Sequence, residues 1–417
     1  MQIGIPEVSI GESSIQVSDG NYSSKYPKAH EFLPSGIPFV SANNLSNGRI
    51  IRDNLKFISE KQHASLKKGH VRTGDVLLVT RGSLGTTALV TREFDDANIN
   101  AQLVLLRADN ATVDSCYLFF VANSPAFQRQ LASNASGTAQ PQLPIGPLKR
   151  LTIPLPPLPV QRRIAGILSA YDELIENSQR RIRIQESMAR ALYREWFVQF
   201  RYPGHEKVPR VASPLGEIPR GWEVKSVADS FEISGGGTPS RKEEAYWDGG
   251  TIQWFSPSDL TGAGTMFMDD SSDHITVLGL AESSARLFPA RSVMLTSRAT
   301  IGAIAINTHE ACTNQGFITC IPNERVPLYF LFHWLTENVP TFQRMASGAT
   351  FKEISRGVFK TINHVHPPTN LVNQFEDAAM PMAEQALWLQ RQIQTLRRTR
   401  DLLLPRLLSG QVKLTTN

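Results

Sequence analysis

The chain contains one pattern twice. Asp75–Gly85 ends an apolar run with Arg-Gly-Ser-Leu-Gly, and Ser292–Gly302 ends a similar run with Arg-Ala-Thr-Ile-Gly. Arg81 therefore corresponds to Arg298, at an offset of 217 residues (298 − 81). This repeat distance is far longer than the roughly 20–50 residues of solenoid and propeller repeats. It predicts a duplicated domain and a pseudo-symmetric molecule.

Short apolar runs bounded by turn residues occur at matching places in both halves, as is typical of buried strands. The predicted strands are Val76–Thr80 and Leu103–Leu106 in the first half, and Val293–Thr296 and Phe317–Ile321 in the second. Tyr117–Ala122 and Leu328–Leu335 are predicted to be buried helical segments. Each half therefore begins with a domain of mixed strands and helices.

A long helical pattern closes each half. Its seam residues are Ile164, Leu168, Tyr171, Ile175, Ile182 and Leu192 in the first half, and Phe375, Leu389, Ile393, Leu396 and Leu403 in the second. The same register also includes the small or apolar residues Ala189, Ala379, Met382 and Ala386 and the polar residues Ser178, Gln185 and Arg400. Across all of these positions the spacing alternates between four and three, which favours a coiled-coil seam. The first helix would be about 60 Å long at 1.5 Å per residue. An antiparallel pair is the simplest geometry, and the alternative is two independent amphipathic helices, each packed on its own domain.

Prolines mark where these helices begin. Pro156-Pro157 precedes the first and Pro367-Pro368 the second, and proline is tolerated at a helix start. Pro381 lies inside the second pattern and is expected to kink that helix or mark its true start. Prolines and glycines between 203 and 221 predict a linker into the second half.

These patterns predict an α+β fold in which two pseudo-symmetric α/β domains are separated by two long helices that form an antiparallel coiled coil. The predicted boundaries are 1–157 for the first domain, 158–200 for the first long helix, 201–368 for the linker and second domain, and 369–417 for the second long helix and C-terminal tail.

Composition limits the function classes only mildly. The 43 Lys+Arg against 38 Asp+Glu give a net charge of +5, which permits an anionic partner such as nucleic acid without demanding one. Cys116, Cys312 and Cys320 lack zinc or redox spacing, which favours a reducing cytoplasm. No signal peptide is indicated, and no apolar run approaches the roughly 20 residues of a membrane span.

The motifs favour binding over catalysis, because no phosphate loop, zinc-protease helix or Gly-x-Ser-x-Gly elbow is present. Arginine donates to guanine edges or phosphates, and a nearby hydroxyl supports it. The candidate DNA contacts are Arg81 with Ser83, Arg298 with Thr300, Lys25 and Lys28 in an aromatic loop, Arg241 and Lys242 after a triple glycine, and Gln140, Gln142 and Lys352 in two matching segments. Each also has a plain interpretation. Arg81 and Arg298 could be structural arginines that bond loop carbonyls, the triple-glycine and aromatic segments could be solvated loops, and the two matching segments could be ordinary connections between strand and helix. His364 and His366 are interpreted as structural, and no metal site is predicted.

Several blocks together resemble the specificity subunits of bacterial type I restriction-modification systems. They are Phe39–Leu45 and Phe255–Leu260, the two strand-Arg-x-x-x-Gly blocks, the Gly235–Ser240 loop, Leu155–Ala165 before the first helix, and Leu404–Gly410 near the end. The resemblance covers essentially the whole chain. It implies two target-recognition domains, each reading half of a split, asymmetric sequence in double-stranded DNA.

The resemblance also implies partners. The paired helices would space the half-sites and dock two methyltransferase subunits, which bind S-adenosylmethionine and methylate adenine at N6, and motor-nuclease subunits would add restriction. The chain itself would hold no cofactor and catalyse nothing. The alternative is a coiled-coil scaffold that assembles proteins without sequence-specific DNA binding. A third alternative is a free-standing enzyme. Methyl transfer or DNA cleavage by the isolated, purified chain would support it.

Overall fold

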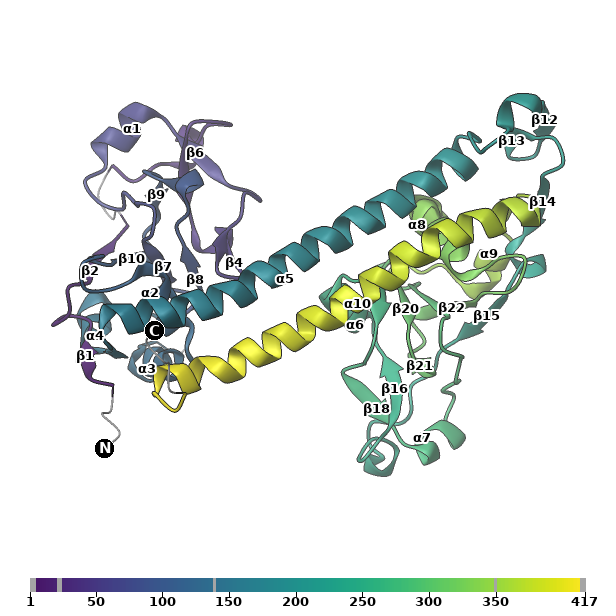
Figure 1. Ribbon diagram of the computed structural model, residues 1–417. Helices are drawn as coiled ribbons and strands as arrows, with labels where there is room; N and C mark the ends of the chain where they lie inside the picture. Colours follow the sequence, from purple (N-terminus) through teal and green to yellow (C-terminus); the bar gives the residue numbers. More distant parts are fainter. Residues whose placement is uncertain (1–4, 21–24, 138–139, 349–350, 413–417) are drawn as a thin grey trace. The chain divides into compact units, whose positions relative to one another are not determined.

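The computed structural model describes residues 5–20, 25–137, 140–348 and 351–412. These residues divide into two compact units. Unit 1 comprises residues 1–177 and 393–417, and unit 2 comprises residues 178–392. Each unit therefore holds one copy of the repeated pattern together with part of each long helix (Figure 1).

Unit 1 is built from short strands and helices. Its strands are β1 (Glu7–Ser9), β2 (Gln16–Asp19), β3 (Ile37–Val40), β4 (Leu45–Ser46), β5 (Arg49–Ile50), β6 (Lys56–Ile58), β7 (Val76–Val79), β8 (Thr87–Leu89), β9 (Asn98–Ile99), β10 (Leu103–Arg107) and β11 (Thr152–Pro154). Its own helices are α1 (Glu60–Ser65), α2 (Ser115–Asn123), α3 (Pro125–Asn134) and α4 (Ile145–Arg150).

Unit 2 has a similar composition and begins with an additional hairpin. Its strands are β12 (Arg210–Ser213), β13 (Gly216–Pro219), β14 (Glu223–Ser226), β15 (Glu232–Gly235), β16 (Ile252–Phe255), β17 (Phe267–Met268), β18 (Asp273–Ile275), β19 (Val293–Thr296), β20 (Ile304–Asn307), β21 (Ala311–Thr313), β22 (Phe317–Ile321) and β23 (Asn363–His366). Its own helices are α6 (Pro257–Ala263), α7 (Val277–Ala281), α8 (Leu328–Met345) and α9 (Arg356–Lys360). The additional hairpin is β12–β13, which occupies the segment that the prolines predicted to be a linker.

The strand order confirms the duplication. The main sheet runs β2-β10-β7-β8 in unit 1 and β15-β22-β19-β20-β17 in unit 2. A second sheet runs β6-β3-β9 in unit 1 and β18-β16-β21 in unit 2, in each case with one antiparallel and one parallel pair. A helix covers equivalent strands of each main sheet, namely α2 on β7 and β8, and α8 on β19 and β20. The predicted strands and buried helices are all present.

The repeated blocks Phe39–Leu45 and Phe255–Leu260 share a helix N-cap. The side-chain oxygen of Asn44 accepts hydrogen bonds from the backbone and hydroxyl of Ser41, at 3.0 and 2.8 Å. Asp259 accepts the same two bonds from Ser256, at 2.7 and 2.8 Å. Burial alone would raise the pKa of Asp259, but hydrogen bonds from Ser272 and Ser256 outweigh it and lower the pKa. In each unit these hydrogen bonds fix the turn that follows the strand, β3 in unit 1 and β16 in unit 2.

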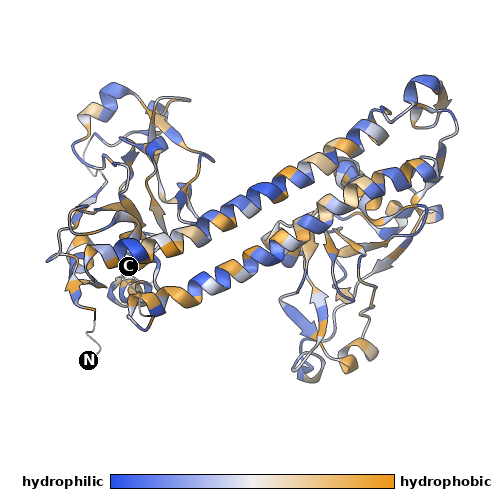
Figure 2. Cartoon of the chain, viewed as in Figure 1, coloured by the Kyte–Doolittle hydropathy of each residue, from blue (hydrophilic) through white to orange (hydrophobic). Residues whose placement is uncertain are grey.

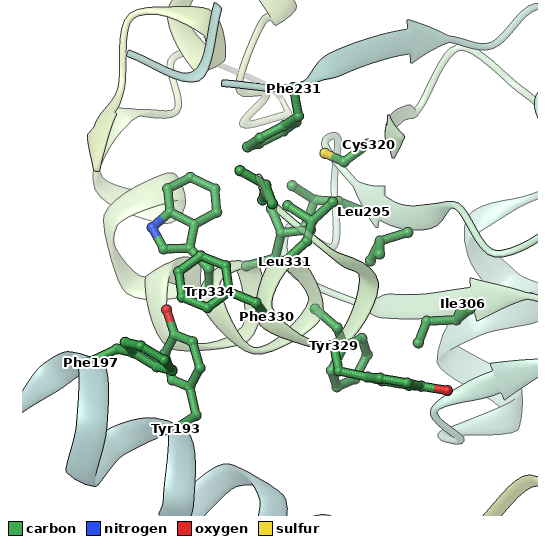
Figure 3. Packing of buried hydrophobic residues seen from close by; sticks show 14 of the residues in the cluster. Tyr193, Phe197, Phe231, Leu295, Ile306, Cys320, Tyr329, Phe330, Leu331 and Trp334 are labelled. Atoms are coloured by element: carbon green, nitrogen blue, oxygen red, sulfur yellow. The ribbon is translucent and has the colours of Figure 1, made fainter. Parts of the chain in front are cut away.

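Aromatic side chains dominate the core of unit 2. Figure 3 shows Tyr193 and Phe197, from the helical segment at one side, meeting Phe330 and Trp334 of α8. The ring centroids of Phe197 and Phe330 lie 4.9 Å apart in an edge-to-face contact. Such contacts add about 0.5–1.5 kcal/mol to the hydrophobic gain. The long helix is therefore part of the core of this unit.

Both long helices contribute to both units. Helix α5 (Leu158–Tyr193) continues into a π-helical turn (Arg194–Val198), and helix α10 spans Thr369–Leu408. The helical pattern was predicted to reach Phe200, but Phe200 itself has a positive φ of 60°, which no helix tolerates. Pro381 is interior to α10, so it does not mark the helix start.

Within each unit the two helices run antiparallel. In unit 2, Gln185 of α5 hydrogen-bonds Gln385 of α10, and Tyr193, further along α5, contacts the earlier Phe375 on α10. In unit 1, Asp172 forms an ion pair with Arg400 at 2.5 Å. Figure 2 shows hydrophobic and hydrophilic positions alternating along both helices.

The predicted seam residues are withdrawn from solvent. Ile164, Leu168, Ile175, Phe375, Leu389 and Ile393 are buried, and Tyr171, Ile182, Leu192, Leu396 and Leu403 are partly buried. Many of them share a core with the neighbouring α/β elements, so pairing and packing on the domains occur together. Among the described residues, no helix is both long and apolar enough to cross a membrane.

Candidate nucleic-acid interface

In unit 1 the candidate loop begins where β7 ends. The four residues of β7 are buried, and Arg81 and Ser83 follow them on the surface. Gly82 between them has φ of +92°, a conformation that favours glycine and turns the chain sharply. The apolar strand therefore anchors a short, exposed loop that carries a cation and a hydroxyl.

A second segment joins this loop. Arg81 forms an isolated antiparallel bridge with Gln142, and the Gly82 N–H donates to the Pro141 carbonyl at 3.3 Å. Leu143 N–H donates to the Thr80 carbonyl at 2.9 Å, which continues the alignment. Gln140 and Gln142 are exposed beside the loop. The structure thus brings Arg81, Ser83 and Gln142 to one edge of the unit.

Unit 2 builds the same junction from different residues. Arg298 bridges Glu353, and the Ala299 N–H donates to the Lys352 carbonyl at 3.1 Å. Ala299 occupies the place of Gly82 and also has a positive φ, of 60°. Arg298 and Glu353 lie 3.8 Å apart as a half-exposed ion pair. Arg298, Thr300 and Lys352 are all exposed at this edge.

A repeated glutamine holds each loop from behind. Gln128 Nε2 donates to the Gly85 carbonyl at 2.9 Å, and Gln343 Nε2 donates to the Ile301 carbonyl at 3.1 Å. Both glutamines belong to the repeated Phe-Gln-Arg triplets, at 127–129 and 342–344. The sequence alone did not indicate this role for the glutamines, although the repeated triplet was a visible signal. They pre-organise the loop, which lowers the entropy cost of binding.

The triple glycine has a packing role. A Cβ on Gly236 would lie 2.0 Å from the Asn314 carbonyl oxygen, and one on Gly20 would lie 2.1 Å from the Asn100 carbonyl oxygen. Gly20 and Gly236 directly follow β2 and β15, the equivalent edge strands. Gly20 and Gly236 therefore allow the backbone after the edge strand to contact the backbone of Asn100 and Asn314, respectively. This packing role was not predicted from the sequence.

Arg241 is engaged within unit 2. Its guanidinium lies 2.5 Å from Asp273 and stacks 3.6 Å from the ring centre of Trp247. Lys242 beside it is exposed. In unit 1, Lys25 and Lys28 are also exposed, and part of the predicted aromatic loop around them, residues 21–24, lies outside the described residues. Arg241 therefore makes its contacts with Asp273 and Trp247 of its own unit.

A pocket of about 430 Å³ adjoins the unit 2 loop. Its walls include the backbone of Gly235 and Gly236, Ser297, Glu353 and Arg356. Ser297 and Glu353 flank Arg298 in the loop junction, so the pocket opens beside the candidate contact surface. Its serine, glutamate and arginine side chains can form hydrogen bonds with a polar group.

His364 and His366 form a buried network. The Nε2 atoms of the two rings lie 2.9 Å apart, and His366 Nε2 lies 2.8 Å from Ser230 Oγ. Burial, with the positive neighbours added, lowers the pKa of His364 to about 3 and that of His366 to about 4. Both rings therefore stay neutral at physiological pH.

The comparisons with known proteins identify the class. The family model for the type I restriction modification DNA specificity domain matches residues 20–186 and again residues 219–378. The matches cover well over half of the chain and coincide with its two copies. The chain belongs to this family, and its role is that of a DNA sequence-recognition subunit of a restriction-modification system.

Individual relatives agree over nearly the full length. The MjaIX specificity subunit of Methanocaldococcus jannaschii is 25% identical over 400 residues, covering 93% of this chain and 89% of the relative. The HindI specificity subunit of Haemophilus influenzae is 22% identical, covering 97% and 99%. The crystal structure of a type I S subunit from M. genitalium has a TM-score of 0.61 at 16% identity, covering 96% of this chain and 95% of that one, and supports the fold.

Proposed function

We propose that each unit reads one half of a bipartite DNA target. The observation that carries this is the duplicated junction, which places Arg81 and Arg298 at the same point of two equivalent domains. Arginine can donate two hydrogen bonds to the guanine edge in the major groove or clamp a phosphate. Two such modules in one chain match two half-sites.

The two half-sites are proposed to differ in sequence, because the two loops present different groups. Arg81 lies beside the neutral amide of Gln142, whereas Arg298 lies beside the carboxylate of Glu353. A carboxylate accepts hydrogen bonds and disfavours nearby acceptor atoms, while an amide both donates and accepts. Different donors and acceptors at equivalent places select different base edges.

The long helices α5 and α10 are proposed to set the unread spacer and to dock the partner subunits. Exposed hydrophobic side chains support a docking role, since such residues on a helix are typical of interaction surfaces. On α10 they include Met380 and Trp388, which is 69% exposed, and on α5 they include Ile184 and Met188. The proposed partners are two methyltransferase subunits and, where the system restricts, motor-nuclease subunits.

In this scheme the chain supplies specificity and its partners supply chemistry. The methyltransferase subunits would bind S-adenosylmethionine and methylate adenine at N6, and the chain itself would be non-catalytic. Because the net charge of this chain is only +5, the partners are also expected to supply part of the phosphate contact that dominates affinity. The complex is expected to act in the cytoplasm, where it meets the cellular DNA.

A pair of substitutions tests the two-module proposal. Arg298→Ala and Arg81→Ala are made separately, and each chain is assembled with its methyltransferase. Removing a bidentate arginine contact should cost about 1–3 kcal/mol and relax reading at its own position. Each variant should therefore lose discrimination in one half-site only, and in opposite halves. Arg201→Ala, which removes an exposed ion pair with Glu195, is the matched control.

The readout is binding to duplexes in which either half-site is scrambled. If both half-sites weaken equally in both variants, the arginines contact the DNA backbone generally. If neither half-site responds, the assignment of these loops to base recognition is wrong. A complex that assembles but binds no duplex specifically would support the scaffold alternative.

A further inference from the structure

We propose that unit 1 carries a binding site for a zinc-class divalent cation, formed by His63, His70 and Asp96. One donor atom from each residue lies within 4.8 Å of the others. His63 Nε2 is 3.1 Å from Asp96 Oδ2, and His70 Nδ1 is 3.6 Å from Asp96 Oδ1. Two imidazoles and one carboxylate form a ligand set that zinc commonly takes in proteins.

The hydrogen bonds behind the rings set the donor atoms. His70 Nε2 lies 2.7 Å from the Leu66 carbonyl oxygen, which can only accept, so this nitrogen carries the proton. The neutral ring then directs the lone pair of Nδ1 toward Asp96. His63 Nδ1 contacts the Asn98 side-chain oxygen in the same way, which directs the lone pair of Nε2 toward Asp96. Metal-binding histidines typically have their second nitrogen held by such an oxygen.

A cation fits this arrangement. When both rings are neutral, two lone pairs and a carboxylate face one another, and a cation between them would bind all three donor groups. The donor atoms lie within 4.8 Å of one another, and a zinc ion with bonds of about 2.0–2.2 Å would draw them closer together. Asp96 is 69% exposed at its side chain, so a fourth position is open to water.

The backbone holds the three residues together. The Asp96 N–H donates to the Val71 carbonyl, and the Val71 N–H donates to the Ala97 carbonyl, both at 2.9 Å. Asp96 itself has a positive φ of 60°, a conformation that asparagine and aspartate tolerate better than most residues. A carboxylate that the backbone holds toward two histidines is a feature that a binding role explains.

Among the residues that the structure describes, only unit 1 has this group of ligands. The parallel strand pair β3–β9 aligns Asn98 with Phe39, and the equivalent pair β16–β21 aligns Cys312 with Trp254. Cys312 is buried in an apolar cluster with Trp254 and Ile275, where unit 1 has its polar site. A bound cation would tie helix α1, which carries His63, to the turn before β9. It would thereby stiffen the second sheet of unit 1.

Metal binding by the full chain tests the proposal. The chain, purified without chelator or metal-affinity steps, is titrated with Zn²⁺ by calorimetry and with Co²⁺ by visible absorption. One ion per chain is expected, and the Co²⁺ spectrum should indicate low coordination number. Asp96→Asn preserves the shape and the backbone preference, and should weaken binding at least about 10–100-fold, the range seen when even supporting residues are lost. His63→Ala and His70→Ala should each abolish stoichiometric binding.

His30→Ala is the matched control, because His30 is an exposed histidine of the same unit. It should leave the titration unchanged. A competing arrangement needs no metal. In it the Asn98 amide is rotated so that its NH2 group donates to His63 Nδ1, and His63 Nε2–H donates to Asp96. A wild-type chain that binds neither ion stoichiometrically overturns the proposal, whether or not the variants fold. Equal binding by wild type, His63→Ala and Asp96→Asn would also overturn it, because the ion would then lie elsewhere.

Discussion

Acid should destabilise unit 2 through the buried ring of His333. This side chain is 2% exposed. Its ring centroid lies 5.7 Å from that of Tyr193, in a stacked contact, and 5.9 Å from that of Phe375. Burial, and secondarily the nearby positive charge of Arg190, lower its pKa from 6.5 to about 4. The folded unit therefore resists protonation of a ring that the unfolded chain protonates readily.

The sign and size follow from proton linkage. The unfolded chain binds more protons than the folded one between pH 6.5 and about 4, so stability rises with pH across this window. Above pH 6.5 the neutral His333 ring does not reduce the free energy of unfolding. This free energy decreases as the pH falls from 6.5 toward about 4, the pKa of His333 in the folded unit. Between pH 7 and pH 5 a single site with these pKa values loses about 2 kcal/mol. His364 and His366 should act in the same direction.

Tryptophan fluorescence isolates this unit, because all six tryptophans lie within residues 178–392. Denaturant unfolding of wild type and His333→Phe is followed at pH 7 and at pH 5. The variant should lose about 2 kcal/mol less than wild type on acidification, since the titrating group is gone. Thr336→Val, a change without a titrating group on the same helix, should match wild type. Equal losses in wild type and His333→Phe would refute the reasoning.

Two further predictions concern unit 1. Gly20→Ala should destabilise it by more than the usual 1–3 kcal/mol of overpacking, because the new Cβ would lie 2.1 Å from a backbone oxygen. Gly166→Ala should instead stabilise unit 1 by about 0.5–1 kcal/mol, because Gly166 lies inside helix α5 and an added Cβ would have no neighbouring atom within 4 Å. Thermal melts of the wild type and the two glycine variants measure both changes. Arg107→Ala should cost about 3–5 kcal/mol, because it leaves the buried carboxylate of Asp75 without its bidentate partner. Arg52→Ala breaks only an exposed pair and should cost under about 1 kcal/mol, and similar losses in the two arginine variants would show that burial of Asp75 does not matter.

The sequence predicted the features that repeat or that follow a regular period. Buried strands such as β7 and β19, and the long helices, carry their signal in local runs of apolar residues. The correspondence of Arg81 with Arg298 was visible as a repeated block, and the structure places both at equivalent junctions. Local patterns predict local structure because burial on one face imposes a period.

Features that depend on distant contacts were not predictable in this way. Gly236 is required by a carbonyl of Asn314, 78 residues later (314 − 236), and nothing in its neighbourhood indicates that approach. Arg241 looked like a free cation in a glycine-rich loop, yet it pairs with Asp273 and stacks on Trp247. His63 and Asp96 lie 33 residues apart in sequence. Such residues acquire their roles from tertiary packing.

The most direct test of the central claim is the pattern of DNA methylation that this chain directs. The chain is co-expressed with its methyltransferase subunit in a host without such modification, and N6-methyladenine is mapped across the genome. We predict one bipartite, asymmetric motif with a fixed, unread spacer. A soluble, assembled complex that leaves the genome unmethylated, or methylates it without a bipartite motif, would contradict the account.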